Sequence, residues 1–167
     1  GNYIVTVTDN AGCVVTSSNN ITSPTAITIQ TVSQQNVKCF GNNTGNINIA
    51  ASGGTGTLSY LWSNGNTTSS VTSLTMGNYS VTVTDQNNCT KQQSFTITQP
   101  ASALSSSTTP VGTSCGLNNG SALAVPAGGT SPYKFLWSNG SNTAQINNLA
   151  SGNYTVTVSD FYNCSLT

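Results

Sequence analysis

The sequence has almost no charge and lacks residue types on which most enzymes depend. Its 167 residues hold three Lys and Arg together, three Asp and Glu together, and no His. General acid–base catalysis needs titratable groups near each other, and a nucleophilic cysteine needs a neighbouring base. The composition therefore predicts a protein that is not an enzyme and that binds no cofactor.

The scarcity of charge also bears on partners and location. Lys38, Lys91 and Lys134 are too widely spaced to form the basic stripe that binds phosphates, so we expect no nucleic acid. No apolar run approaches the about 18 residues that span a bilayer. A nearly uncharged, strand-rich chain is prone to edge-to-edge association in a crowded cytosol. We therefore expect an extracellular, cell-surface location.

One stretch occurs in three copies and sets the organisation of the chain. The copies read GNYIVTVTDNAGC from Gly1, GNYSVTVTDQNNC from Gly77 and GNYTVTVSDFYNC from Gly152, with a period of about 75 residues. We expect the last strands of a truncated repeat at 1–24, a complete repeat at 25–99, and a repeat lacking most of its last strand at 100–167. Because Gly1 lies inside a repeat, we expect neighbouring repeats of a longer chain as the main partners.

The complete repeat has the pattern of an antiparallel β-sandwich. Apolar and polar residues alternate from Tyr79 to Val83, which indicates a strand with one buried face. Further strands are expected at 27–32, 46–51, 58–62 and 71–74, with a short traverse at 67–70, giving about seven strands between Gly and Asn turns. The fold class is therefore all-β, with tandem immunoglobulin-like sandwiches that form an extended rod through short proline junctions at Pro24 and Pro100.

The same pattern predicts the core. The residues expected to be buried together in the complete repeat are Trp62, Leu74, Tyr79, Val81 and Val83, and their counterparts are Trp137, Leu149, Tyr154, Val156 and Val158. Tyr79 also has the spacing of a tyrosine corner, in which the hydroxyl bonds back to the preceding turn.

A family resemblance follows from the joint motifs. Cys39, GGTGTLSYLWSNG and GNYSVTVTDQNNC recur as Cys115, GGTSPYKFLWSNG and GNYTVTVSDFYNC. This order resembles the SprB-type repeat of the large surface adhesins of gliding Bacteroidetes. The resemblance implies an extracellular protein exported by the type IX secretion system, whose repeats form a long stalk. Gliding motility itself does not follow from it.

The five cysteines are the main candidates for chemistry: Cys13, Cys39, Cys89, Cys115 and Cys164. No closely spaced pair suits zinc, so we expect disulfides, in keeping with an oxidising exterior. If the traverse counts as a pass along the sandwich, five passes place Cys39 and Cys89 at opposite ends, and Cys39 faces Cys164 across the junction. A count of four passes restores a bridge from Cys39 to Cys89. The traverse favours the first scheme, but both remain open at this stage.

Two other patterns have plain structural interpretations. Asp9, Asp85 and Asp160 recur at one position, but one carboxylate per repeat is too few for calcium, so they are interpreted as turn caps and no metal site is expected. The aromatic residues at Tyr60 and Trp62 have core spacing, which favours burial over a sugar-stacking platform.

The sequence therefore predicts an adhesin stalk that holds a distal binding region away from the cell and carries mechanical load. Two alternatives stay open. In one, each repeat binds glycan or another extracellular surface, for which Phe161 and Tyr162 are the only indication. In the other, the chain is a filament subunit whose incomplete end repeats are completed by neighbouring chains.

Overall fold

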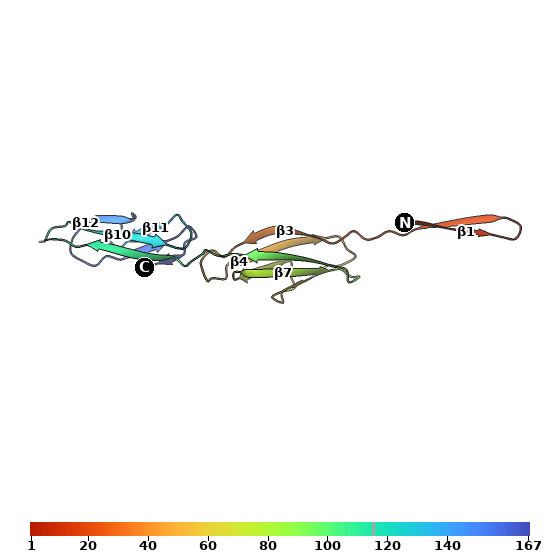
Figure 1. Cartoon of the computed structure of the whole chain (residues 1–167), viewed down its shortest axis with the longest axis horizontal. Helices are drawn as coiled ribbons and strands as arrows, with labels where there is room; N and C mark the ends of the chain where they lie inside the picture. The colour runs from red at the N-terminus through yellow and green to blue at the C-terminus, as the bar shows by residue number, and fades with distance from the viewer. Residues whose placement is uncertain (115) are drawn as a thin grey trace.

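A computed structural model of the chain describes residues 1–114 and 116–167, and its regular elements are all strands. Figure 1 shows a hairpin at the N-terminal end, followed by two sandwich-like units in succession along the long axis of the view. Every strand pairing in the described residues is antiparallel.

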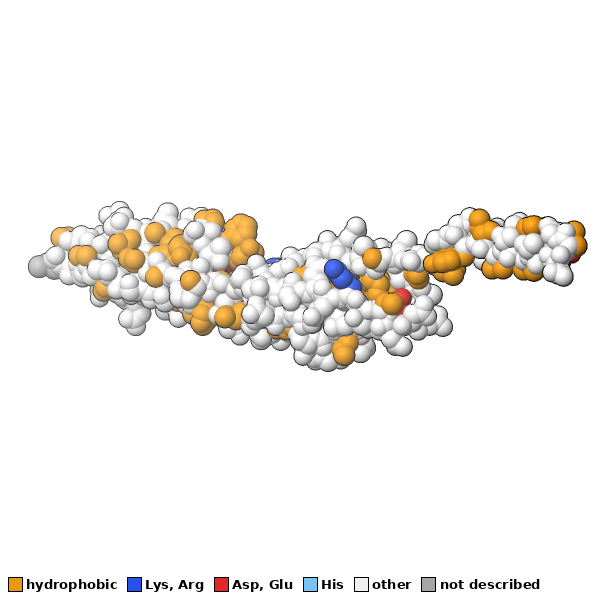
Figure 2. All heavy atoms as spheres, turned by 45° about the vertical axis from the view of Figure 1, so that its right-hand side comes forward, with side chains coloured by type: hydrophobic (Ala, Val, Ile, Leu, Met, Phe, Trp, Pro, Cys, Tyr) orange, Lys and Arg blue, Asp and Glu red, His pale blue; other side chains and the backbone are white. Residues whose placement is uncertain are grey.

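The N-terminal hairpin consists of β1 (Asn2–Thr8) and β2 (Val14–Asn20). The two strands pair without a register shift, from Asn2 opposite Asn20 to Thr8 opposite Val14. Every residue of both strands is exposed, including Tyr3 at 61%. Figure 2 shows the resulting run of apolar side chains along the hairpin. A lone hairpin has no second layer against which its alternating apolar residues could pack, so these residues stay exposed.

The middle unit contains two three-stranded sheets. One sheet has the order β3 (Thr28–Gln35), β4 (Gly45–Ser52), β6 (Ser70–Leu74), and the other has the order β5 (Ser59–Trp62), β7 (Gly77–Thr84), β8 (Thr90–Ile97). This grouping is that of an immunoglobulin-type sandwich without its fourth strand in the first sheet.

Two details of the expected strand order need correction. The first strand runs from Thr28 to Gln35 rather than over 27–32, because Ile27 is buried ahead of the strand and the ladder continues past a register shift. The segment 67–70 is not a separate strand, so the unit has six strands and not about seven. It does cross between the sheets, since the Ile49 N–H donates to the Ser69 carbonyl and the Trp62 indole donates to the Thr68 carbonyl.

The core of the middle unit lies between the two sheets. It includes Ile47 and Ile49 from β4, Trp62 from β5, and Val81 and Val83 from β7. The indole of Trp62 lies 5.6 Å from the ring of Phe95 in β8. Of the residues expected in this core, Leu74 is also buried, while Tyr79 is half-buried against it. Its hydroxyl donates to the Thr75 carbonyl at 3.1 Å, which is the bond of a tyrosine corner.

The last unit repeats this arrangement. Its sheets have the orders β12 (Gln145–Leu149), β10 (Gly120–Ala127), β9 (Ser105–Val111) and β11 (Lys134–Trp137), β13 (Val156–Ser159), β14 (Ser165–Leu166). Trp137, Leu149, Val156 and Val158 are buried, and Tyr154 is half-buried against them. The Tyr154 hydroxyl donates to the Ala150 carbonyl at 3.3 Å, so this unit has the same corner.

Candidate functional site

The turn after β7 holds a cysteine at its end through one aspartate. Both the Asn87 and the Cys89 N–H groups donate to Oδ1 of Asp85, at 2.9 and 2.8 Å. The Asp85 N–H in turn donates to the Cys89 carbonyl at 3.0 Å, and Asn88 adopts a left-handed φ of 62°. The sequence prediction of a turn cap therefore describes Asp85 correctly, as far as this oxygen is concerned.

The other oxygen of Asp85 holds a second segment, which the sequence reading missed. Oδ2 accepts the Thr55 N–H at 2.8 Å, and the Gln86 N–H donates to the Thr55 carbonyl at 3.0 Å. Thr55 follows Gly53 and Gly54, so the Gly-Gly-Thr motif lies against the aspartate turn. The available signal was the joint recurrence of Gly-Gly-Thr and Asp in both repeats.

The glycines of this motif are required by close approach of the backbone. Gly53 has a φ of 84°, and a Cβ there would lie 2.1 Å from the Ala26 carbonyl oxygen. At Gly54, with a φ of 67°, a Cβ would lie 2.9 Å from Cβ of Asp85. We call the Gly-Gly-Thr loop and the Asp–Cys turn together the end face of a unit; in the middle unit they are 53–55 and 85–89.

The last unit has an equivalent end face at 128–130 and 160–164. Asp160 accepts the Tyr162 and Cys164 N–H groups on Oδ1, both at 2.9 Å, and the Thr130 N–H on Oδ2 at 2.9 Å. Gly129 donates to the Ser102 carbonyl at 3.0 Å. This end face therefore lies beside residue 102, at the junction with the middle unit.

The loop that carries Cys39 lies at the opposite end of the middle unit. Its neighbour Val37 is buried and donates its N–H to the Thr98 carbonyl at 2.9 Å, and the Gly41 N–H donates to the side chain of Gln99. The loop is thus tied to the residues that lead into Pro100. It meets the end face of the last unit across the junction.

A disulfide closes this junction. Cys39 and Cys164 are bonded with an S–S distance of 1.97 Å and a Cα–Cα distance of 5.7 Å, across a sequence separation of 125. This Cα–Cα distance lies within the usual range for disulfides. This bond confirms the first of the two predicted schemes, in which Cys39 bonds across the junction, and it excludes the bond from Cys39 to Cys89.

Strand direction explains this choice of partner. Gly45 of β4 is opposite Leu74 in β6, and Gly77 of β7 is opposite Ile97 in β8, so these residues lie at the Cys39 end of the unit. β7 then runs away from that end to Thr84, and Cys89 lies beyond it. Eight residues of strand span about 27 Å, far more than a disulfide can bridge.

The remaining cysteines do not form disulfides within the described residues. Cys13 and Cys89 are free and exposed. Cys115, the other disulfide candidate, lies outside the described part of the chain.

The recurring aspartates have a structural role in both units. Each carboxylate of Asp85 and Asp160 is occupied by backbone N–H groups, and no cluster of three or more metal-ligating side chains occurs in the residues described. Burial raises the pKa of the Asp85 carboxyl, but hydrogen bonds from Thr55, Cys89 and Asn87 outweigh it and hold the pKa below its ordinary value.

The aromatic residues of β5, and those of β11 and of the position just before it, do not form an exposed platform. Trp62 and Trp137 are buried, and Tyr60 and Tyr133 are half-buried. The exposed aromatic pair is Phe161 and Tyr162, with ring centroids 5.0 Å apart in an edge-to-face arrangement. Both residues belong to the turn that ends at Cys164.

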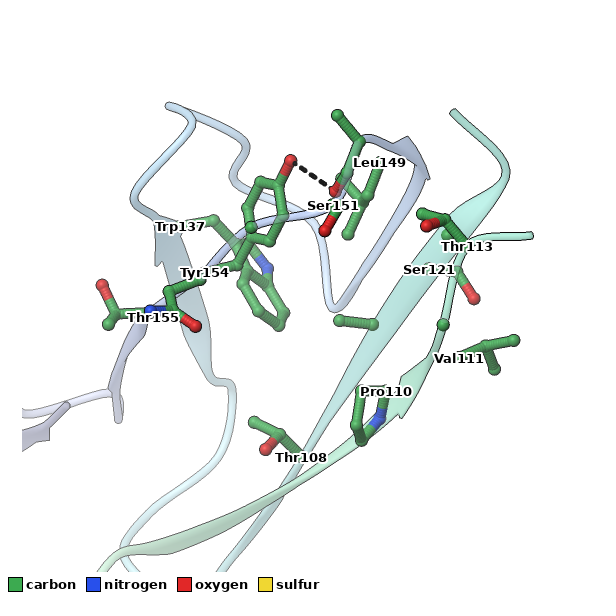
Figure 3. Close-up of a pocket in the computed structure, with 16 residues that line it drawn as sticks. Thr108, Pro110, Val111, Thr113, Ser121, Trp137, Leu149, Ser151, Tyr154 and Thr155 are labelled. Atoms are coloured by element: carbon green, nitrogen blue, oxygen red, sulfur yellow. Dashed lines mark hydrogen bonds between the residues drawn. The ribbon is translucent and has the colours of Figure 1, made fainter. Parts of the chain in front are cut away.

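A cleft of about 650 Å³ lies on the last unit. Figure 3 shows Trp137 and Tyr154 beside it, with Leu149 above and Pro110 and Val111 on the opposite wall. In the middle unit the equivalent surface of Trp62 is covered by Phe95 of β8. The cleft therefore lies where β8 covers the core tryptophan in the middle unit, and we assign no ligand to it.

A family model matches two parts of the chain. The family described as the SprB repeat matches residues 31–67 and 105–142, which begin in β3 and at the start of β9 and end just after β5 and β11. None of the curated proteins compared with the chain matches it. Across the described residues, no helix is long and apolar enough to cross a membrane.

Proposed function

Because the chain is built of SprB-type repeats, we propose that it is part of the stalk of an extracellular, cell-surface adhesin. SprB repeats imply a cell-surface protein with an adhesin-type repeat region. The finer proposal is that these repeats form an extended rod that holds a distal binding region away from the cell and carries tension. In this role the partners of each repeat are its neighbours in the chain, and no enzymatic step or nucleic acid is involved.

The observation that carries the proposal is the bond between Cys39 and Cys164, which joins two successive repeats. Tension applied along the chain would pass from 25 to 39, cross the disulfide and leave through 164. The residues between 40 and 163 would then lie outside the shortest covalent path. Such an arrangement suits a tether, because a pull on the array passes through β3 and a covalent bond and bypasses the other strands of the middle unit.

The short junction supports the same role. Only seven residues separate β8 at Ile97 from β9 at Ser105, and Pro100 stiffens this segment because its φ is restricted. The disulfide adds a second connection beside the peptide link. Two connections restrict bending between units more than one does, which favours a rod over a flexible string.

The test of the stalk has two parts on native cells. Antibodies against the 167-residue chain should label intact cells, and excess purified chain should leave the attachment of those cells to surfaces unchanged. A stalk has no binding site of its own with which to compete. Labelling that requires permeabilised cells would contradict the surface location, and a loss of attachment would contradict the stalk.

A second candidate function is binding of glycan or another surface by the repeats themselves. The observation that favours it is the exposed pair Phe161 and Tyr162, because exposed aromatic rings are typical of binding surfaces. The corresponding residues of the middle unit are Gln86 and Asn87, so the pair is not common to both repeats. Replacing both rings with serine should abolish competition in the attachment assay if this function is correct.

A further inference from the structure

The late cysteine of the middle unit occupies the same structural position as the bonded cysteine of the last unit. In both units the cysteine N–H donates to Oδ1 of the aspartate four residues earlier, at 2.8 Å for Cys89 and 2.9 Å for Cys164. The residue before each cysteine is an asparagine with positive φ, 62° at Asn88 and 61° at Asn163.

The loop behind each turn is also the same. The Thr55 N–H donates to Oδ2 of Asp85 at 2.8 Å, and the Thr130 N–H donates to Oδ2 of Asp160 at 2.9 Å. The bond that returns from turn to loop is likewise present in both, at 3.0 Å from Gln86 and 2.8 Å from Phe161. Two end faces with the same hydrogen bonds therefore present their cysteines in the same way.

The two end faces lie at the same end of their units. Gly54 donates its N–H to the Thr25 carbonyl, and Gly129 donates its N–H to the Ser102 carbonyl. Each face thus lies beside the segment that enters its unit. In the last unit this is the end that meets the early-cysteine loop of the preceding repeat, and there Cys164 is half-buried and bonded, whereas Cys89 is exposed and free.

We propose that Cys89 is a cross-linking site that takes the early cysteine of another SprB-type repeat, in the way that Cys164 takes Cys39. The partner is a loop of the type around Lys38–Cys39–Phe40–Gly41. The inference rests on the repeat structure and on the observed disulfide, and not on the stalk proposed above. A free Cys89 would leave the stalk and its bond between Cys39 and Cys164 in place.

The reaction needs an oxidant, for which we name a thiol–disulfide oxidoreductase in its disulfide form. The Cys89 thiolate attacks one sulfur of that disulfide to form a mixed disulfide and release a thiolate. The thiolate of the partner cysteine then attacks Sγ of Cys89 and expels the oxidoreductase sulfur that is bonded to it in the mixed disulfide. Two cysteine thiols lose two protons and two electrons in all, and the oxidoreductase leaves as a dithiol.

The test is peptide mapping of the protein taken from native cells, with free thiols alkylated before any reduction. We expect the Cys89 peptide to be joined to a peptide whose single cysteine lies in an early-cysteine loop, with the Cys39–Cys164 pair present in the same digest. Migration under non-reducing and reducing conditions distinguishes the two sources of that loop. A partner in the same polypeptide leaves the mass unchanged, and a partner in a second polypeptide raises it.

A pair of substitutions provides matched controls. Cys89→Ser should make one early cysteine newly accessible to alkylation and leave the Cys39–Cys164 pair intact, whereas Cys39→Ser should release Cys164 alone. Recovery of Cys89 already alkylated, or bonded to a small thiol, while Cys39–Cys164 stays oxidised would overturn the proposal.

Discussion

At the scale of single residues, Asp85 joins two segments that are distant in sequence. One of its oxygens closes the turn that ends at Cys89, and the other holds Thr55 of the Gly-Gly-Thr loop. An ionised carboxylate accepts on both oxygens, whereas protonation turns one of them into an O–H donor. The end face therefore depends on the charge of one side chain.

This dependence predicts a specific response to acid. The pKa of Asp85 is lowered in the folded protein, so its contribution to stability is present above the unfolded value of about 4 and is lost as the pH falls through the folded value. Asp85→Asn should lower the melting temperature at neutral pH, because its amide NH₂ would face an N–H donor. The same substitution should also reduce the loss of stability on acidification below about pH 4.

Thermal melts of both proteins from neutral to acidic pH measure this effect. Asp9→Asn is the matched control, because Asp9 closes the same kind of turn with bonds to Ala11 and Cys13 in the exposed hairpin. It should leave the melting of the sandwiches unchanged. An Asp85→Asn protein with the acid sensitivity of the parent would contradict the assigned role.

The glycines of the end face allow a second prediction. Gly53 and Gly65 both have a φ of 84°, but a Cβ at Gly65 meets nothing within 4 Å, while one at Gly53 lies 2.1 Å from a backbone oxygen. Gly65→Ala should cost about 1 kcal/mol of unfolding free energy for the left-handed backbone. Gly53→Ala should cost about 1–3 kcal/mol more, because the backbone must shift. Urea denaturation compares the two, and equal losses would show that the close approach does not matter.

At the scale of elements, β8 completes the core of the middle unit. It pairs with β7 over its whole length, from Gly77 opposite Ile97 to Thr84 opposite Thr90. Phe95 and Ile97 are buried, while Thr96 between them is exposed. The alternation that predicts a strand is therefore also the alternation that closes the sandwich over Trp62.

Removal of the Phe95 ring from β8 should open a cavity in the core. Phe95→Ala should lower the unfolding free energy of the middle unit by about 3–5 kcal/mol, because Phe95 is buried against Trp62. Tryptophan fluorescence during denaturation reports this, since Trp62 and Trp137 are the two tryptophans of the chain. Phe40→Ala is the control, because Phe40 is 46% exposed and should change stability by less than about 0.5 kcal/mol. Similar losses for both variants would place β8 outside the core.

At the scale of the whole molecule, the disulfide converts two successive units into one closed loop. The sequence separation of 125 between Cys39 and Cys164 means that most of both units lies inside that loop. Unfolding of the cores under tension therefore releases little length while the bond is intact.

Single-molecule pulling from the two termini tests this property. Reduction of the bond, or Cys39→Ser, should increase the released length by roughly 400 Å, since the chain is freed over a sequence separation of 125 and extends by about 3.3–3.6 Å per residue. Cys13→Ser is the matched control and should behave like the parent, because Cys13 is free. A released length that is independent of reduction would show that the bond does not lie in the path of the force.

The repeat, the strand content and most of the core could be predicted because they depend on local patterns. Alternation from Tyr79 to Val83 indicates one buried face whatever the rest of the chain does, and the tyrosine corner needs only four residues of separation. Details that depend on neighbours were less accurate. The segment 67–70 is expected to be a short traverse that counts as one pass, but Thr68 and Ser69 bond to Trp62 and Ile49, and only Ser70 joins a strand ladder.

The sequence by itself determined that this is an all-β protein with an internal repeat, since periodicity and turn chemistry are properties of the linear chain. Only the tertiary structure decided that Cys39 bonds to Cys164 and that Asp85 holds the Gly-Gly-Thr loop. Both contacts depend on which ends of the strands meet in space. That outcome follows from the number and direction of all the passes between two residues, so no short stretch of sequence contains it.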